Sequence, residues 1–550
     1  MLLVRRFRFW RAPMRQYMAE VLRRVRQVTD SDTVNPRLTA RRDSNLIGPL
    51  VAAVTCLVVA AALVPSVLPH GAGLTPDSAT YGAAARSLAE GRGYLDVDGV
   101  SPMLDFPPMY PLLLAPVLMF GAQPGTAAAI VGIASALALA LLLLAWSREL
   151  GLSRFGQFAV AVVSLTLPPM VDSYTSMLSE APFIALWTGS CWMLTRVLQG
   201  SRHPRRDLAI LTALLASAGL TRYLGLALIV GVCVCLLGIE GTRRRRATTA
   251  LTVAVGAASP LAIWLIRNKI QAGTFTAPDY GASRTSLGSH LFDDLTGIGA
   301  WLVGDSSDSW SLVVGIAVVL LPVGICVFAT RRRPIPGTAR RPVTAVAVVS
   351  LAYLTLLLMG QTLVGLDTDD RFVRPLAPTL VLLVAVTATR PARLRGKAVR
   401  TGAAALTLLL VGAHSVPGVL QHIDDGEHAG LADYNASRWQ HSSLLAALRT
   451  HPPKRILVSN DAYAVSLLAR LPVEQSPATV YDNSSQPTGD LEQFQNDVQD
   501  QPRTLAWFNN PDVGQLVTLD NLAKAVCLKK VQPFDDGLLL ETCGSVPRGL

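Results

Sequence analysis

The chain has 550 residues, of which 51% are hydrophobic and only 16% are charged. An average soluble domain carries about 25% charged residues, so this composition excludes a typical soluble globule. The net charge of +11 would suit a nucleic-acid-binding protein, but the arginines lie in short clusters between apolar runs. Such clusters are typical of the cytoplasmic loops of membrane proteins, so we expect the lipid bilayer as a partner and no nucleic acid.

The apolar runs are long enough to cross a membrane, because about 20 apolar residues span the hydrocarbon layer as a helix. Taking each run as one helix predicts an α-helical polytopic membrane protein, the transmembrane domain 46–420, with about eleven membrane-spanning helices. The predicted spans are 46–69, 124–146, 155–171, 177–199, 207–220, 223–240, 248–267, 310–330, 343–365, 373–389 and 401–420.

The arginine clusters predict which way these helices run. Residues 1–45 are too long and too charged for a cleavable signal peptide, which predicts a basic cytoplasmic tail before an uncleaved anchor. If this tail lies on the cytoplasmic side of a cell membrane, all the later clusters fall on that same side, as the positive-inside rule requires. One alternative is a single long helix over 207–240, which would move the cluster Arg243–Arg246 outside. The polar break at Thr221-Arg222-Tyr223 favours two helices instead.

The loop 70–123, on the predicted extracytoplasmic side, holds a short helix. Thr75 is suited to cap it and Pro76 to begin it, and small apolar residues follow at helical spacing. This helix is too short to span, so we expect it to lie along the outer membrane surface. Asp77 stands in its first turn, where it either complements the helix dipole or has a function of its own. The proline-rich stretch that begins at Asp105 predicts an interfacial or re-entrant segment.

Residues 421–550 have an ordinary soluble composition and predict a C-terminal extracytoplasmic domain of α/β or α+β type. Its local patterns favour helices over 443–448 and 462–470 and strands over 455–459 and 503–508. Cys527 and Cys543 flank a segment that resembles two short strands, and a disulfide between them would need an oxidising compartment. No spacing of Cys and His indicates a metal site.

Several short motifs follow one another along the predicted outer face. They are Asp77 with the helix ending in Gly91-Arg92-Gly93-Tyr94, Pro107-Pro108-Met109-Tyr110-Pro111-Leu112-Leu113, Ser179-Glu180, Leu220-Thr221-Arg222, Trp264-Leu265-Ile266-Arg267-Asn268, Asp370-Arg371-Phe372 and Arg374-Pro375-Leu376-Ala377-Pro378. In this order they resemble the GT-C glycosyltransferases over roughly residues 46–390. The polyprenol-dependent members, such as the protein mannosyltransferases and the lipid A aminoarabinose transferase, are the most similar. Protein mannosyltransferases typically carry an Asp-Glu pair where this chain has Asp77-Ser78, which disfavours a strict protein O-mannosyltransferase.

The resemblance implies transfer of a sugar from a polyprenyl phosphate donor to a hydroxyl of a cell-envelope acceptor, a glycan, lipid or protein, with inversion. Asp77 would then be the general base that takes the proton of the attacking hydroxyl. Asp105 would assist Asp77 or bind a divalent cation, and no other cofactor is implied. The rival hypothesis is a transporter or flippase that moves the lipid-linked sugar without chemistry. The sequence does not identify the sugar or the acceptor.

The leaving phosphate needs fixed positive charge nearby, which arginine supplies with bidentate geometry. Four arginines stand at predicted outer helix ends, against the positive-inside trend, and each either binds the donor phosphate or extends to the interface. They are Arg222, Arg267, Arg371 and Arg374.

Three further residues complete the candidate site. Tyr81, Glu180 and Tyr223 are expected to line the donor cavity. Glu180 opens a membrane helix, where an ionisable group is costly, so it either faces that cavity or pairs with an arginine. Asp367, Asp369 and Asp370 are interpreted as solvated loop charges, with Asp370 able to orient Arg371 or Arg374.

Overall fold

The computed structural model describes residues 44–276, 286–303, 308–332, 337–364, 369–389, 415–480 and 488–545. The chain forms two compact units, Met1–Val54 and Thr55–Leu550, and helix α2 (Ser44–Val67) carries the chain from the first to the second. The account below concerns the second unit.

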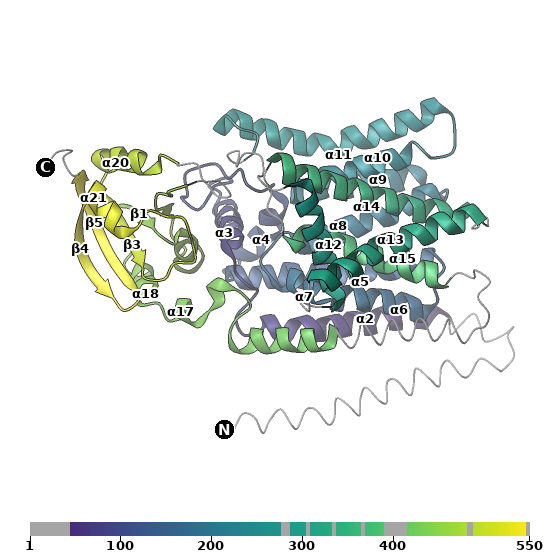
Figure 1. The fold of residues 1–550 in the computed structure, drawn as a ribbon, viewed down its shortest axis with the longest axis horizontal. Coiled ribbons are helices and arrows are strands. Elements are labelled where there is room, and N and C mark those ends of the chain that lie inside the picture. The colour runs from purple at the N-terminus through teal and green to yellow at the C-terminus, as the bar shows by residue number, and fades with distance from the viewer. Residues whose placement is uncertain are drawn as a thin grey trace, which may run out of the picture. The chain divides into compact units, whose positions relative to one another are not determined.

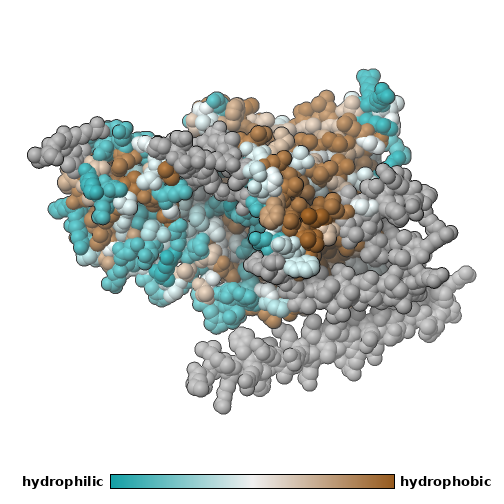
Figure 2. Space-filling model, in the orientation of Figure 1, coloured by the Kyte–Doolittle hydropathy of each residue, from teal (hydrophilic) through white to brown (hydrophobic). Residues whose placement is uncertain are grey.

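Most of the described chain folds into helices (Figure 1). After α2 they are α5 (Pro124–Glu149), α6 (Arg154–Thr166), α7 (Pro168–Thr175), α8 (Glu180–Leu198), α9 (Pro204–Thr221), α10 (Gly225–Leu236), α11 (Arg243–Ala272), α12 (Leu287–Val303), α13 (Asp308–Arg332), α14 (Gly337–Val364) and α15 (Ala377–Thr389). In Figure 2 hydrophobic residues cover much of these helices, whereas the C-terminal domain is mostly hydrophilic. Apolar side chains facing outward need a lipid environment, which agrees with a multi-pass membrane protein.

The predicted helices are found, but fewer of them satisfy the requirements for a membrane span. Four described helices are long and apolar enough: Gly48–Val67, Pro124–Glu149, Arg243–Ala272 and Arg341–Leu363. The bent pair α6 and α7, with an angle of 67° between them, would make a fifth. The other predicted spans coincide with helices that do not meet these requirements over their described residues, except 401–420, most of which lies outside the described residues.

One break and one additional helix refine the prediction for the membrane part. The expected break after Thr221 is present, because α9 ends there and α10 begins at Gly225. The predicted outer loop 268–309 instead contains a helix, α12, which packs against α13. A Cβ atom at Gly299 would lie 1.7 Å from the Ser311 carbonyl oxygen, and one at Gly315 would lie 1.8 Å from that of Leu295. Glycine therefore allows these two helix backbones to touch.

The first loop contains α3 (Pro76–Ala89) and α4 (Met109–Met119). The sequence predicted α3 correctly, with Thr75 as N-cap and Pro76 as the first residue. The helix is buried by other parts of the protein on nearly every side from Ser78 to Ala85, and its place along the outer membrane surface stays a prediction. The reason for this burial is the run of alanine and glycine in α3, which lets neighbouring segments approach it from all directions.

The C-terminal region begins with a helix over residues 415–428 and continues into a mixed α/β fold. Its elements are η3 (Asp433–Asn435), α17 (Ser437–Gln440), α18 (Ser443–Thr450), β1 (Ile456–Ser459), α19 (Ala462–Ala464), η4 (Val465–Ala469), β2 (Glu474–Gln475), α20 (Asp490–Asp500), β3 (Arg503–Phe508), α21 (Leu519–Ala525), β4 (Val526–Phe534) and β5 (Gly537–Ser545). The sheet has the order β2-β1-β3-β5-β4, in which β2, β1 and β3 are parallel and β5 runs antiparallel to β3 and β4. A disulfide joins Cys527 in β4 to Cys543 in β5.

One hydrophobic core joins the first loop to the C-terminal region. Tyr81 and Leu114 of the loop belong to the same buried cluster as Leu445, Leu467 and Phe508 of the C-terminal region. In Figure 1 α3 and α4 accordingly lie between the membrane helices and the sheet. The helix that carries Asp77 is therefore packed from both sides.

Candidate functional site

Asp77 is held at the start of α3 by local hydrogen bonds. The Thr75 amide donates to Ser78 Oγ at 2.9 Å, and the Ser78 hydroxyl donates to the Met177 carbonyl oxygen at 3.0 Å. Ser78, at the position where an Asp-Glu pair would have its Glu, thus fixes the first turn to the segment before α8. The carboxylate of Asp77 keeps 31% of its surface exposed.

Arg371 bridges Asp77 to a second carboxylate. It lies in the short helix η1 (Asp370–Phe372), and its Nη1 is 2.6 Å from Asp77 Oδ2 while its Nε is 2.7 Å from Asp369 Oδ2. Burial disfavours the guanidinium charge, but the carboxylates of Asp77, Glu180 and Asp369 outweigh it and raise the pKa of Arg371. Asp369 is therefore an ion-pair partner and not a solvated loop charge.

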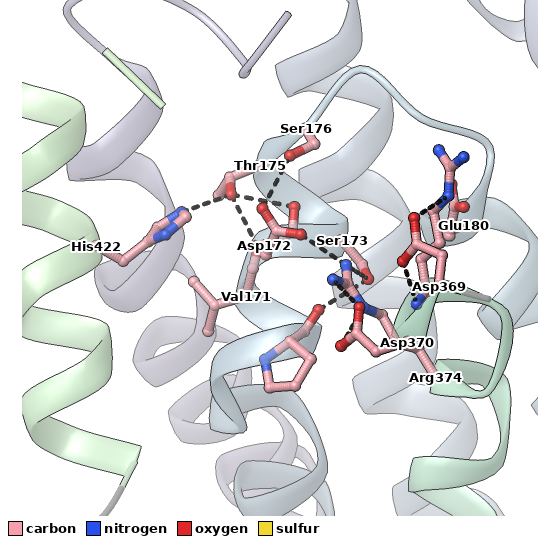
Figure 3. A network of polar contacts seen from close by, with 12 residues as sticks. Val171, Asp172, Ser173, Thr175, Ser176, Glu180, Asp369, Asp370, Arg374 and His422 are labelled. Atoms are coloured by element: carbon pink, nitrogen blue, oxygen red, sulfur yellow. Dashed lines mark hydrogen bonds and ion pairs between the residues drawn. The ribbon is translucent and has the colours of Figure 1, made fainter. Parts of the chain in front are cut away.

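Arg374, in η2 (Arg374–Leu376), bridges another pair of carboxylates (Figure 3). Its guanidinium is 2.6 Å from Asp172 and 2.9 Å from Asp370, and it also donates to Ser173 Oγ at 3.2 Å. Burial raises the pKa of Asp370, and the charge of Arg374 partly offsets this. Asp370 does orient Arg374, one of the two roles that the sequence left open.

The same network reaches the helix over residues 415–428. His422 Nε2 lies 2.7 Å from Thr175 Oγ1, and the neighbouring Ser176 hydroxyl donates to Asp172 at 3.1 Å. Figure 3 shows these side chains in a continuous chain of contacts that ends at Arg374. The network thus connects α7, η1, η2 and the start of the C-terminal region.

Arg222 forms an enclosed ion pair with Glu180. Only 13% of the Arg222 side chain and 1% of the Glu180 side chain are exposed. Arg222 also donates to Ser179 Oγ at 3.3 Å, which accepts from the Tyr81 hydroxyl at 2.9 Å. Of the two roles proposed for Glu180, the structure therefore favours pairing with an arginine.

An aromatic ring connects the two clusters. The guanidinium carbons of Arg222 and Arg371 lie 5.2 Å and 5.4 Å from the centre of the Phe372 ring. The Tyr353 hydroxyl fixes this segment by donating to the Phe372 carbonyl oxygen at 2.7 Å. Asp77, Arg371, Phe372 and Arg222 thus converge from elements that are distant in the sequence.

Arg267 differs from the other three arginines, because no carboxylate pairs with it among the described residues. Its guanidinium lies 4.7 Å from the centre of the Trp264 ring and contacts the carbonyl oxygens of Tyr94 and Met103 at 3.4 Å. These carbonyls belong to the loop between α3 and α4. Arg267 therefore combines an aromatic support with an uncompensated charge.

Tyr223 lies near both Arg267 and Asp105. The Tyr223 hydroxyl donates to the Leu104 carbonyl oxygen at 2.9 Å and lies 3.4 Å from Trp264 Nε1. Asp105 has no hydrogen-bond or ion-pair partner in the part of the chain that the structure describes. Burial, with smaller contributions from Asp96 and Asp77, raises the pKa of Asp105 to about 7.

Asp172 and His422 were not assigned to the site from the sequence, and Ser179 and Phe372 were named only as parts of motifs, without a role. Asp172 falls between the predicted spans 155–171 and 177–199, on the predicted outer face, as does Asp369. Acidic residues on the face that also holds the four unusual arginines were the signal that could have identified both as ion-pair partners. Among the described residues, no group of three or more His, Cys, Asp or Glu side chains could hold a metal ion.

A family model matches part of the chain. Residues 105–264 match the family described as dolichyl-phosphate-mannose-protein mannosyltransferase, a range that includes Asp105, Glu180 and Arg222. No curated protein matches the chain by sequence.

Solved structures resemble nearly the whole chain. ArnT from Cupriavidus metallidurans in the apo state has a TM-score of 0.58 at 14% identity, over 91% of this chain and 98% of ArnT. The same protein bound to undecaprenyl phosphate has a TM-score of 0.59 at 13% identity, over 90% of this chain and 97% of that chain. Arabinofuranosyltransferase AftD from Mycobacteria has a TM-score of 0.52 at 14% identity, over 91% of this chain and 42% of AftD. These similarities establish the GT-C fold.

Proposed function

We propose that this chain, which has the fold of the GT-C membrane glycosyltransferases, moves a sugar from a polyprenyl phosphate to a hydroxyl of an extracytoplasmic envelope acceptor. The observation that carries the proposal is the convergence of Asp77, Arg371 and Arg222 around the Phe372 ring. The match of residues 105–264 to a mannosyltransferase family and the undecaprenyl phosphate bound to ArnT support the class of donor.

The proposed reaction is a single displacement at the anomeric carbon. The acceptor oxygen forms a bond to C1 while the bond from C1 to the phosphate oxygen breaks, so the configuration inverts. The electron pair leaves with the polyprenyl phosphate, and the hydroxyl proton passes to a carboxylate. A positioned general base accelerates such a step by about 10² to 10⁴.

Asp77 is our candidate for this base. Arg371 holds its Oδ2, whereas Oδ1 has no partner among the described residues and can take a proton. The ion pair with Arg371 fixes the carboxylate in one orientation, which is what a base needs before substrate arrives. Asp105 is the supporting carboxylate, because it is unpaired among the described residues and its pKa of about 7 suits proton transfer near neutral pH.

We assign the first contact with the donor phosphate to Arg267. The other three arginines already face carboxylates, so a phosphate must compete with Asp77, Asp172 or Glu180 for them. Arg267 has no such competitor among the described residues. Arg371 would then share its guanidinium between Asp77 and the phosphate as negative charge develops on the leaving oxygen.

Replacing Arg267 with Ala is expected to raise the KM for the polyprenyl-phosphate donor by about 10- to 100-fold, the value of one charge-assisted hydrogen bond. Initial rates against donor concentration measure this effect. Arg154, an exposed arginine at the start of α6, provides the matched control, since an Arg154→Ala variant should keep the wild-type KM. Equal donor KM values for wild type and Arg267→Ala would contradict the assignment.

The transfer rate is expected to rise with pH around 7, because Asp105 gains its negative charge there. An Asp105→Asn variant has no group to ionise and should lose this acidic limb of the profile, whereas Asp105→Glu should retain a limb. The pH profile of kcat/KM at saturating acceptor measures it. If the rate of Asp105→Asn still rises with pH around 7 as in the wild type, another group is responsible for that rise.

The purified protein in detergent distinguishes a transferase from a transporter or flippase. A micelle has no two compartments, so movement of a lipid across a bilayer cannot give a product. A transferase will convert polyprenyl-phosphate-linked hexose or pentose donors into labelled acceptor and free polyprenyl phosphate when an envelope extract is added. A protein that binds these donors but never cleaves the bond to C1 would be a transporter.

A further inference from the structure

We infer that Asn435, in the C-terminal region, is a positioning residue that sets the place of α3 and hence of the Asp77 carboxylate. The inference rests on the proposed function, in which Asp77 takes the proton. It assigns to the C-terminal region a part in the chemistry, although that region contains none of the proposed catalytic groups.

The amide of Asn435 holds the segment that leads into α3. Its Oδ1 accepts from the Leu74 amide at 2.7 Å, and its Nδ2 donates to the carbonyl oxygens of His70 and Ala72 at 3.2 Å and 3.3 Å. The Tyr434 amide adds a bond to the Leu74 carbonyl oxygen at 3.1 Å. Asn435 is only 4% exposed, so these groups have little access to water.

Ala72 and Gly73 of this segment also bond to the start of α5 and to residues at and after the end of α7. The Ala72 amide donates to the Gly125 carbonyl oxygen at 2.9 Å, and Gly73 exchanges bonds with Thr175 and Met177 at 2.7 Å and 2.8 Å. A Cβ atom at Gly73 would lie 3.2 Å from the Leu431 and Ala432 side chains, so the lack of one permits this convergence. The side-chain amide of Asn435 therefore supplies hydrogen bonds to His70, Ala72 and Leu74 that no other described residue supplies.

The C-terminal region also holds the other end of α3. The Arg86 guanidinium donates to the Ser466 carbonyl oxygen of η4 at 2.9 Å, and a Cβ atom at Gly82 would lie 3.6 Å from the Leu467 side chain. The helix is thus fixed before its first residue and in its last turn by one region. Asp77 lies between these two attachments, three residues after Leu74.

Position matters for a general base, because a misplacement of about 1 Å can lower a rate by about 10²-fold. A change at Asn435 would let the first turn of α3 shift against the arginines. Those arginines lie directly after α9 and in α11, η1 and η2, and Asn435 makes no hydrogen bond to these elements among the described residues. The structure therefore separates the placing of the base from the binding of the donor phosphate.

The test is an Asn435→Asp variant of the full chain in detergent. Asp keeps the acceptor for Leu74 but loses both N–H donors and places a carboxylate against two carbonyl oxygens. We expect kcat to fall about 10- to 100-fold while the donor KM stays near the wild-type value. An Asn510→Asp variant makes the same chemical change at an exposed position and should keep the wild-type kcat.

Amide hydrogen exchange gives a second measurement that does not depend on transfer. Exchange in residues 74–80 should become faster in Asn435→Asp and stay unchanged in Asn510→Asp. If Asn435→Asp does not fold, Arg86→Gln tests the other attachment and should also lower kcat without raising the donor KM. The inference is overturned if Asn435→Asp and Arg86→Gln both fold and both show the kcat and the amide hydrogen exchange of the wild type. If the wild type is inactive, but Asn435→Asp still accelerates the slow hydrogen exchange of α3, only the proposed function is rejected.

Discussion

Replacing Asp77 with Asn is expected to lower the rate of sugar transfer by about 10² to 10⁴, the usual contribution of a general base. Donor binding should be retained, because the uncharged amide of the Asp77→Asn variant no longer competes with the phosphate for Arg371. Single-turnover transfer and donor binding, measured on the same preparation, separate the two effects.

Asp369 provides the matched control for this change. It is the other carboxylate on Arg371, at 2.7 Å from Nε, and it has no proposed role in proton transfer. An Asp369→Asn variant should therefore lose much less activity than Asp77→Asn. Equal losses would mean that both residues act only by orienting Arg371, and the role of Asp77 as base would be wrong.

The second large effect is expected for Arg222→Met. This change leaves Glu180, which is 1% exposed, as a buried carboxylate without its ion-pair partner. Breaking a buried pair on one side costs about 3–5 kcal/mol. Thermal unfolding in a fixed detergent should show a correspondingly lower midpoint.

The double variant Arg222→Met with Glu180→Leu separates stability from function. Replacing both partners of a buried pair by apolar residues is often neutral, so the double variant should regain most of the lost stability. Its transfer activity should stay low, because the guanidinium beside Phe372 is missing. A double variant as unstable as Arg222→Met would show that the pair does not account for the loss.

The membrane helices could be predicted because their apolar runs are long, and the break at Thr221–Tyr223 because it is polar. Helix α12 was missed because His290, Asp293 and Asp294 interrupt its apolar pattern. Two of these side chains, His290 and Asp294, are buried, and Asp294 accepts from the Gln361 amide at 3.2 Å. Local hydropathy cannot reveal such a tertiary partner.

The arginines of the site could be predicted because they break the positive-inside rule, which is a property of the sequence alone. Their partners could not be, because a pair such as Arg371 and Asp77 joins residues 294 positions apart. The expected division between the transmembrane domain and residues 421–550 remains a prediction. The core shared by α3 and the C-terminal region shows why sequence composition is a weak guide to such a boundary.

The bond between Leu74 and Asn435 has a consequence for how the protein is made. These residues are 361 positions apart, and a ribosome adds about 5–20 residues per second, so Asn435 is synthesised roughly 20 to 70 s after Leu74. During that interval the His70–Leu74 segment lacks the side chain that later satisfies three of its backbone groups. The first loop therefore stays incompletely folded, and α3 reaches its final position only after this late stretch of the chain has been synthesised.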